Sequence, residues 1–387
     1  MAAPAPAPAS ASAAPRGLPP AAPQPGDSAP WFAARSTNNA RYMFHTVAGR
    51  YVLLGFFGSA RRPEVVEALR QLMAHRSLFD DAQISMFGVS VDPADESEGR
   101  LQQVLPGIRH FWDFDLAVSK LYGATTADAV PGARLAYRSY WLLLDPMLRV
   151  VRAADIGKTA EMLDAIAALP PIQAAEAVAP VLVLPRVLEP ELCRELIARY
   201  EAGTSHDSGF MRDVDGMTQL IMDHSHKRRA DYHIVDEQLQ AALRQRVQRR
   251  LIPEIAKAFQ FHVTRMERYI VSCYDAETGG HFRAHRDNTT KGTAHRRFAV
   301  TINLNAEDYE GGDLRFPEYG ARSYRAPTGG AVVFACSLLH EALPVTRGKR
   351  YAFLPFLYDD AAAAVRDENR RFLADMGQPA EDDAGAG

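Results

Sequence analysis

Three residues with metal-ligand chemistry stand in the second half of the 387-residue chain: His285, Asp287 and His340. His285 and Asp287 are two positions apart, a spacing that points both side chains to one face of a β-strand. His340 follows the apolar segment 330–335 and a short connector, so it is the best candidate for a third ligand from a later strand. Two imidazoles and one carboxylate leave coordination positions open, as in non-haem Fe(II) oxygenases. Zinc stays open as an alternative, although a structural zinc site normally has a fourth protein ligand.

Arg350 adds a second chemical signal beyond His340, because it begins an apolar segment that ends at Tyr358. A guanidinium inside an apolar barrel is costly to bury without an anionic partner. Arginine binds a carboxylate through two parallel hydrogen bonds, so a dicarboxylate cosubstrate would supply that partner. Taken alone, Arg350 could equally be a surface residue after the turn at Gly348. Together with the metal ligands, it favours a cosubstrate site.

The predicted secondary structure that positions these residues differs between the two halves of the chain. Between residues 26 and 170, buried-strand runs alternate with helical spacing, which predicts an α/β sandwich with a central sheet. The boundary is expected near residue 175. After it, helices are expected over 189–200 and, as one long helix, within 237–260. Short strands separated by Gly, Pro and Asn then predict an antiparallel sandwich or barrel up to Tyr358. The expected elements of the first part are the strands 51–57 and 84–91, the helices 63–75 and 158–169, and a hairpin over 139–153.

Composition restricts the classes of partner and compartment. Lys and Arg total 44 against 47 Asp and Glu, a net charge of −3 that disfavours a nucleic-acid partner. No apolar stretch reaches the length of a membrane-spanning helix. The three cysteines are odd in number and form no C-x-x-C pair, which argues for a reducing, cytoplasmic compartment. Residues 1–25 are almost entirely Ala, Pro and Ser, and this composition predicts a disordered tail in place of a secretory signal.

The second half resembles the prolyl 4-hydroxylase-like branch of the 2-oxoglutarate/Fe(II) dioxygenases, over residues 180–358. The resemblance rests on the segment Cys273 to Asn288 and on His340 followed by Arg350, together with Thr301-Ile-Asn-Leu-Asn305 and Gly311-Gly-Asp-Leu-Arg-Phe-Pro317. It implies an α+β double-stranded β-helix, or jelly roll, over 178–358. It also implies Fe(II) as cofactor, 2-oxoglutarate as cosubstrate, and ascorbate as a reductant after uncoupled turnover.

Carried over residue by residue, the resemblance makes His285, Asp287 and His340 the iron ligands. Arg350 would bind the distal carboxylate of 2-oxoglutarate. Tyr274 falls where the family often has a tyrosine that hydrogen-bonds the cosubstrate, with a packed strand aromatic as the alternative. Asn303 replaces a second cosubstrate-contacting tyrosine of the hypoxia-type relatives, and Thr301 on the same strand face would share its role. Gly311 and Gly312 are expected to serve a turn and close backbone packing.

The first half, residues 26–172, resembles the peroxiredoxin branch of the thioredoxin superfamily. The resemblance rests on Gly26-Asp-Ser-Ala-Pro30-x-Phe32, Ala48-Gly-Arg-Tyr-Val-Leu-Leu-Gly-Phe-Phe57 and Gly88-Val-Ser-Val-Asp92. The family's thiolate stands at the start of the first helix, but here residues 26–170 contain no cysteine, so thiol peroxidase activity is rejected. Arg61 and Arg62 in that turn would attract an anion or partner, or simply be solvated. A structural, dimerising or substrate-recruiting role is left.

The resulting hypothesis is a hydroxylase that releases succinate and CO₂ while acting on a prolyl or other amino-acid residue or on a small molecule. Residues 203–233 are expected to contact the substrate as a lid, with His206, His224 and His226 as surface or lid residues. The alternative is a non-catalytic interaction or sensor protein whose folds act as scaffolds. A homodimer through the first domain stays open, and neither nucleic acid nor membrane is expected as a partner. Residues 359–387 are expected to form a short helix and an acidic tail.

Overall fold

The computed structural model describes residues 22–172, 177–374 and 384–385. The predicted disordered tail, apart from residues 22–25, lies outside these residues, as does most of the predicted acidic tail. The chain divides into two compact units, residues 1–169 and 170–387. No helix in the described part of the chain combines the length and the hydropathy needed to cross a membrane.

The first unit contains a seven-stranded sheet with the order β2-β1-β5-β4-β3-β6-β7. Strands β3, β4 and β5 are parallel to one another, and the other strand pairs are antiparallel. Every residue of β3 is buried, which explains why this strand reads as a continuous apolar run in the sequence. The strands are β1 (Ala33–Ser36), β2 (Asn39–Met43), β3 (Tyr51–Gly58), β4 (Ile84–Ser90), β5 (Ile108–Trp112), β6 (Tyr140–Leu144) and β7 (Val150–Asp155).

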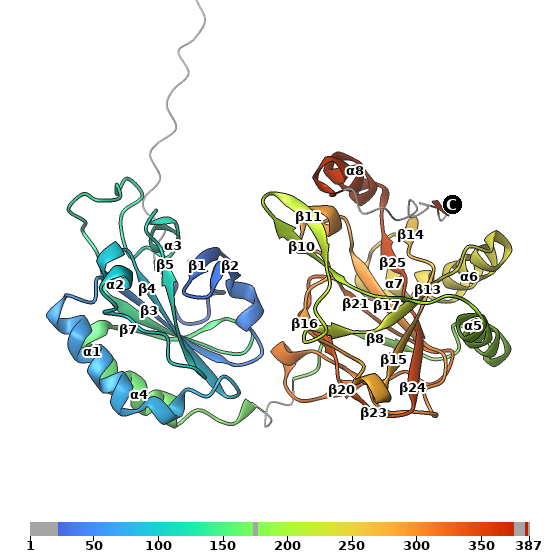
Figure 1. The fold of residues 1–387 in the computed structure, drawn as a ribbon, viewed down its shortest axis with the longest axis horizontal. Coiled ribbons are helices and arrows are strands. Elements are labelled where there is room, and N and C mark those ends of the chain that lie inside the picture. The colour runs from blue at the N-terminus through green and yellow to red at the C-terminus, as the bar shows by residue number, and fades with distance from the viewer. Residues whose placement is uncertain (1–21, 173–176, 375–383, 386–387) are drawn as a thin grey trace, which may run out of the picture. The chain divides into compact units, whose positions relative to one another are not determined.

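Two helices of the first unit, α1 (Pro63–Ala74) and α4 (Thr159–Ala167), run side by side against the sheet (Figure 1). Pro63 occupies the first turn of α1, where a missing N–H costs nothing. The predicted strands, helices and hairpin of this unit are therefore confirmed, and the α/β class with them. The remaining α-helices are the short α2 (Pro93–Ser97) and α3 (Ala117–Leu121).

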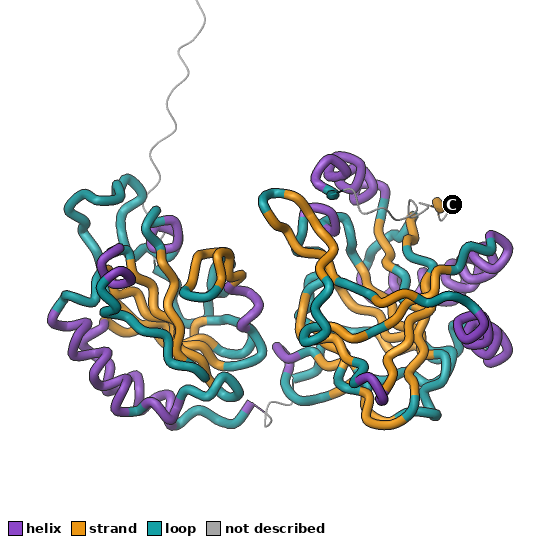
Figure 2. Tube along the Cα trace, in the orientation of Figure 1, coloured by secondary structure: helices purple, strands orange, loops and turns teal. Residues whose placement is uncertain are grey.

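The second unit is built from antiparallel strand pairs, as expected, and its helices lie outside the strands (Figure 2). A ten-stranded sheet includes the path β26-β14-β25-β17-β24-β15-β13-β9, with β21 and β8 joined to β17, and a five-stranded sheet has the order β12-β16-β22-β19-β20. The strands of the larger sheet are β8 (Leu182–Leu184), β9 (His206–Asp207), β13 (Ala230–His233), β14 (Arg265–Glu267), β15 (Ile270–Asp275), β17 (Phe298–Asn303), β21 (Ala331–Ala335), β24 (Lys349–Phe353), β25 (Phe356–Tyr358) and β26 (Ala384–Gly385). Those of the smaller sheet are β12 (Lys227–Arg228), β16 (His281–His285), β19 (Leu314–Arg315), β20 (Ser323–Tyr324) and β22 (His340–Ala342), and two separate hairpins pair β10 (Phe210–Val214) with β11 (Met217–Ile221) and β18 (Glu310–Gly311) with β23 (Val345–Arg347).

Strand alternation gives the larger sheet two different faces. Val271 and Cys273 of β15 and Tyr351 and Phe353 of β24 share one apolar cluster with residues of the flanking helices. Their neighbours Tyr274 and Arg350 therefore point to the opposite face, because successive side chains alternate across a strand. The flanking helices that contribute to that cluster are α5 (Pro190–Ala202), α6 (Glu237–Arg250) and α7 (Ile252–Phe259).

The expectation of one long helix within 237–260 is wrong, because α6 and α7 are separate helices that meet at Leu251. Pro253 is the physical reason: it has no N–H to donate to the carbonyl four residues earlier, and its ring is tolerated only in a first helical turn. The helix expected after residue 359 is present as α8 (Asp360–Asn369), capped by the side chain of Asp359.

Candidate metal centre

The two histidines predicted as ligands face each other across one strand pair. His285 is the register partner of His340 in the antiparallel pairing of β16 with β22. The pairing shifts by one residue between Phe282 and His285, which is a local irregularity of the ladder. Asp287 lies two residues beyond the end of β16, and its backbone N–H donates to the carbonyl of Cys336 at 2.9 Å. Strand geometry therefore places the histidines, and this hydrogen bond fixes the aspartate.

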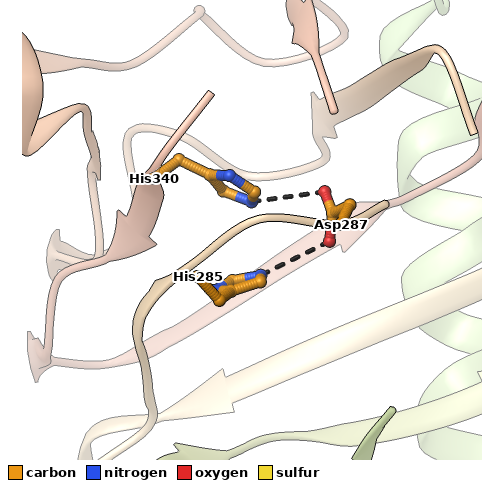
Figure 3. A group of neighbouring side chains, drawn as sticks. All are labelled: His285, Asp287 and His340. Atoms are coloured by element: carbon orange, nitrogen blue, oxygen red, sulfur yellow. Dashed lines mark ion pairs between the residues drawn. The ribbon is translucent and has the colours of Figure 1, made fainter. Parts of the chain in front are cut away.

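The ligand atoms of His285, Asp287 and His340 all lie within 4.8 Å of one another. Figure 3 shows both rings directed at the carboxylate, with His285 Nε2 at 3.4 Å from Asp287 Oδ1 and His340 Nε2 at 3.3 Å from Oδ2. The opposite ring nitrogens contact backbone carbonyls: His285 Nδ1 lies 2.8 Å from Arg283 O, and His340 Nδ1 lies 3.0 Å from Leu338 O. These carbonyls require protonated Nδ1 atoms, so each neutral imidazole presents its Nε2 lone pair to a metal.

The electrostatics of the cluster favour the ligand forms of these side chains. Burial lowers the pKa of His285 to about 4. The charge of His340 also lowers this pKa, whereas the contact with Asp287 raises it. Burial alone would raise the pKa of Asp287, but the charges of His340 and His285 outweigh it and hold that pKa well below its ordinary value. The lowered pKa of His285 favours the neutral imidazole, and the lowered pKa of Asp287 favours the ionised carboxylate, which are the forms that bind a metal.

Aromatic rings enclose the two histidines. The ring of Phe282 stacks on His285 with centroids 3.5 Å apart, and the ring of Phe334 lies 4.5 Å from that of His340. Phe316 adds a third ring at 6.3 Å from His340. This packing holds the imidazoles in place and reduces the access of water to the metal side of the rings.

Arg350 is a buried cation whose hydrogen-bonding capacity is incompletely used. The residue is only 2% exposed, and its Nε and Nη1 have no hydrogen-bond partner among the described residues. It is the register partner of Tyr274, and its guanidinium carbon lies 5.0 Å from the centre of the Tyr274 ring. Unpaired donors on a buried guanidinium are what a carboxylate ligand would satisfy, so the residues present fit a dicarboxylate such as 2-oxoglutarate.

Tyr309 and Gly312 are neighbours of Arg350, and of these two the sequence indicated only Gly312. Tyr309 is 3% exposed, and its hydroxyl has no hydrogen-bond partner among the described residues. Burial raises the pKa of Tyr309, whereas the charge of Arg350 opposes that rise. Gly312 has a φ of +68°, and a Cβ there would lie 3.1 Å from Cδ of Arg350, so glycine meets both the turn and the close approach. The expected packing role of Gly312 is confirmed.

Thr301 and Asn303 are both buried on β17, and they share a strand face with Ala299. Ala299 belongs to the apolar cluster that contains Phe334, the ring beside His340, so this face is directed to the side of the metal centre. The Asn303 amide donates to the carbonyl of Ala326 at 2.7 Å, while its Oδ1 has no partner in the described chain. Contact of Thr301 or Asn303 with a cosubstrate stays a prediction.

His206, His224 and His226 do not join the metal-ligand cluster. Within the residues that the structure describes, His285, Asp287 and His340 form the single such group. His224 Nε2 pairs with the carboxylate of Asp207. The ring of His226 lies 4.5 Å from that of Phe210 and 5.6 Å from that of Phe282. His226 therefore links the β10–β11 segment to the aromatic ring that covers His285.

The first unit has no cysteine at the start of α1. All three cysteines, Cys193, Cys273 and Cys336, lie in the second unit and are buried. At the start of α1, Arg61 is exposed, whereas Arg62 pairs with Glu64 at 2.8 Å and donates to Ser139 Oγ at 3.0 Å. Arg61 is thus exposed, as the solvated alternative expects, whereas Arg62 is held by contacts within the chain.

Comparison with known proteins supports the resemblance drawn from the motifs. Residues 269–358 match the family model of the 2OG-Fe(II) oxygenase superfamily, and this range contains the three clustered ligands and Arg350. A PKHD-type hydroxylase of Synechococcus sp. (strain JA-2-3B'a(2-13)) is 32% identical over 114 residues, which are 28% of this chain and 48% of that protein. The chain thus spans about half the length of the curated relatives it matches.

Solved structures show distant likenesses to both units. A Trichoplax adhaerens prolyl hydroxylase, in complex with a fragment of the hypoxia-inducible-factor oxygen degradation domain, has 17% identity and a TM-score of 0.36. The aligned region covers 48% of this chain and 86% of that one. Peroxidoxin BcpB from Mycobacterium tuberculosis has 17% identity and a TM-score of 0.31, over 38% of this chain and 99% of its own.

Proposed function

We propose that the protein is a 2-oxoglutarate-dependent Fe(II) dioxygenase that hydroxylates a prolyl or other amino-acid residue or a small molecule. The observation that carries this proposal is the combination of the His285–Asp287–His340 cluster with a buried, incompletely paired Arg350 in one matched family segment. On this proposal the second unit is a jelly roll whose two sheets enclose the reaction site.

When bound, Fe(II) would couple the oxidative decarboxylation of 2-oxoglutarate by O₂ to hydroxylation of a substrate C–H bond, with succinate and CO₂ as co-products. The chain's part is to hold and orient the reactants. His285, Asp287 and His340 would present one facial set of ligand atoms, and Arg350 would anchor the far carboxylate of the cosubstrate through paired hydrogen bonds. Tyr274, Thr301 and Asn303 would complete the wall around the cosubstrate, and the aromatic rings would limit the entry of water.

A non-catalytic metal-binding scaffold is the second candidate function. A metal held only for its structural effect would give no reason for the buried, incompletely paired cation at Arg350, because burying such a charge costs free energy without stabilising the fold. We therefore place the catalytic function first. The first unit would serve as a structural, dimerising or substrate-recruiting module, since it has no cysteine for peroxidase chemistry.

The decisive experiment measures binding and turnover separately. Isothermal titration would determine the affinity of the full chain for Mn(II) and then for 2-oxoglutarate, and mass spectrometry would follow Fe(II)-dependent succinate formation with amino acids and peptides. We expect 2-oxoglutarate binding to require the metal, and succinate formation to require both Fe(II) and O₂. Metal-loaded protein that binds no 2-oxoglutarate would contradict the proposal and favour the scaffold. Ascorbate is expected to sustain turnover without being required for binding.

A further inference from the structure

A second group of buried charges lies beside the metal centre and has no part in binding iron or 2-oxoglutarate as proposed above. Its members are Lys227 on β12, Arg229 directly after it, and Asp231 on β13, which are 4%, 6% and 6% exposed. Lys227 Nζ donates to Ser208 Oγ at 2.7 Å, and Arg229 Nη2 donates to the same oxygen at 3.1 Å. The two cations are therefore held together at one point.

Positive charge exceeds negative charge in this group. Asp231 accepts hydrogen bonds from Arg229 Nη2 at 2.7 Å and from Ser272 Oγ at 2.6 Å, and its carboxylate also lies 3.7 Å from Arg268. Burial would raise the pKa of Asp231, but the charges of Arg229, Lys227 and Arg268 outweigh it and hold that pKa far below its ordinary value. Among Lys227, Arg229 and Asp231, two basic side chains thus share one carboxylate.

A proton on Lys227 is costly while no anion is bound beside it. Burial lowers the pKa of Lys227 well below its ordinary value, and the charge of Arg229 lowers it further. Arg229 Nε has no hydrogen-bond partner among the described residues, and its Nη1 reaches only the Tyr274 hydroxyl, at 3.4 Å. Buried cations with unused donors are stabilised when an anion binds to them.

The position of Lys227 links this group to the metal centre. Lys227 is the register partner of Phe282 in the pairing of β12 with β16, and its Nζ lies 4.9 Å from the centre of the Phe282 ring. That same ring stacks on the metal-ligand candidate His285. Asp287 also exerts a charge effect on Lys227, but a bound divalent metal would offset the charge of that carboxylate.

We infer that the substrate is an organic acid whose carboxylate binds to Lys227 and Arg229 while the carbon to be hydroxylated faces the metal. The inference rests on the proposed function, which assigns Arg350 to the far carboxylate of 2-oxoglutarate. The surplus of buried positive charge at Lys227 and Arg229 is then left for the substrate. Free amino acids and other small carboxylates meet this requirement, whereas an uncharged amide of the same shape does not.

The test compares small carboxylic acids with their own primary amides. Acetate, L-proline, L-glutamate, N-acetyl-L-proline and their amides would be titrated into the Mn(II)- and 2-oxoglutarate-loaded full chain, with binding followed by the relaxation of ligand protons near Mn(II). The same panel would be tested for Fe(II)-dependent succinate formation. We expect at least one acid to bind about ten-fold or more tightly than its amide, the size expected for a hydrogen bond to a charged group.

Lys227→Met removes the charge but keeps the length of the buried side chain. In this variant we expect the affinity for the preferred acid to fall about ten-fold or more, with the affinity for 2-oxoglutarate within two-fold of wild type. Lys257→Met is the matched control, since Lys257 is an exposed lysine on α7 that pairs with Glu254, and it should change neither affinity. Far-UV circular dichroism would verify that each variant is folded, and the acid–amide comparison in the wild type does not depend on any variant.

Three results would overturn the inference: amides that bind as well as acids, a panel in which no acid binds, or an acid affinity that Lys227→Met leaves unchanged. The last result would mean that Lys227 only ties Ser208 and Gly209 to the sheet. Each result counts against the inference alone if the protein binds Mn(II) and 2-oxoglutarate normally. Loss of those two affinities in the wild type would contradict the proposed function itself.

Discussion

Two buried polar sites, one in each unit, differ in how completely their polar atoms are hydrogen-bonded. Near the start of α1 in the first unit, the buried carboxylate of Asp95 accepts hydrogen bonds from Ala60 N at 2.8 Å, Ser90 Oγ at 2.7 Å and Arg100 Nη1 at 3.3 Å. In the second unit, Arg350 and Tyr309 are as deeply buried, but each has side-chain polar atoms without a hydrogen-bond partner in the described chain.

This difference separates a polar group that stabilises a fold from one that is available to a ligand. Unpaired buried donors and acceptors cost free energy, so a fold retains them where something else completes them. In the first unit, the start of α1 is occupied by internal hydrogen bonds and contains no thiol. In the second unit, Arg350 and Tyr309 have unpaired polar atoms and lie in the same matched family segment as the metal-ligand cluster.

The largest expected effect is the loss of metal binding in His285→Ala. This substitution removes one of three clustered ligands, so we expect Mn(II) affinity to fall at least 100-fold and Fe(II)-dependent succinate formation to become undetectable. His281→Ala is the matched control, because His281 lies on the same strand but its Nδ1 contacts only the carbonyl of Gly279, at 2.7 Å. Titration calorimetry with Mn(II) would measure both variants, and equal affinities would contradict the ligand assignment.

The second-largest effect is expected in Arg350→Met, where cosubstrate affinity should fall without a loss of stability. In Arg350→Met we expect 2-oxoglutarate affinity to fall about 100-fold, since a buried charged contact to a ligand is worth roughly 2–5 kcal/mol. The metal-free variant should be at least as stable as wild type, because a buried cation with unpaired donors is removed. Arg347→Met is the control, as Arg347 is exposed and pairs with Glu310 at 2.8 Å. Calorimetry and thermal unfolding would measure the two properties.

A wild-type 2-oxoglutarate affinity in Arg350→Met would overturn the role of Arg350. A strongly destabilised variant with normal cosubstrate affinity would also overturn it, because Arg350 would then stabilise the fold, as Asp95 is expected to do in the first unit.

In the first unit, Asp95→Ala should lower stability and leave the ligand sites intact. The substitution strands the buried donors of Ala60 and Ser90, so we expect unfolding of this unit to become easier by about 3 kcal/mol. The three tryptophans, Trp31, Trp112 and Trp141, all lie in this unit, so urea unfolding followed by tryptophan fluorescence reports on it alone. Glu98→Ala is the exposed control. Unchanged unfolding would show that the network around Asp95 does not stabilise the unit.

The smallest effect is a pH dependence of stability at Asp81. Burial would raise the pKa of this carboxyl, but hydrogen bonds from Arg109 and Ser85 and the charge of Arg109 lower it to about 2. Because the folded-state pKa lies below the unfolded value of 3.8, the stabilisation is present above about pH 4 and is lost as pH falls towards 2. A shift of this size corresponds to about 2 kcal/mol.

Asp81→Asn should therefore unfold more easily than wild type at pH 7, and the two should converge between pH 4 and 2 in urea titrations followed by tryptophan fluorescence. A constant difference across that range would contradict the assignment. Asparagine suits the test because Asp81 has a positive φ of 65°, a conformation that asparagine tolerates.

The sequence predicted the elements of the first unit and the residues of the metal cluster because both depend on local patterns. Apolar runs set β3, and the two-residue spacing brought His285 and Asp287 together, although the structure ends β16 at His285 and places Asp287 after the strand. Lys227 and Tyr309 were not predicted, since their positions come from the pairing of β12 with β16 and from a loop that packs against Arg350. Neither contact leaves a periodic signal in the sequence.

The division of the helix at Leu251 could have been read from Pro253, because the rule that proline ends a helix is local. The acidic partners of buried arginines could not have been identified from the sequence. Arg286 pairs with Glu318 at 2.8 Å, whereas Arg350 in the same unit has no acidic partner among the described ion pairs, and both are simply arginines in the sequence. Only the folded structure distinguishes an arginine that is paired within the chain from one that is available to a ligand.

His285 and His340 face each other across β16 and β22, so metal affinity depends on the register in which these strands pair. Successive side chains alternate between faces, so a slip of one residue in either strand would turn one imidazole away from Asp287. A metal ion at 100 times its dissociation constant would then stabilise the correctly paired chain by about 2.7 kcal/mol over slipped pairings that cannot bind it. Metal binding would therefore favour the correct register of these two short strands during folding.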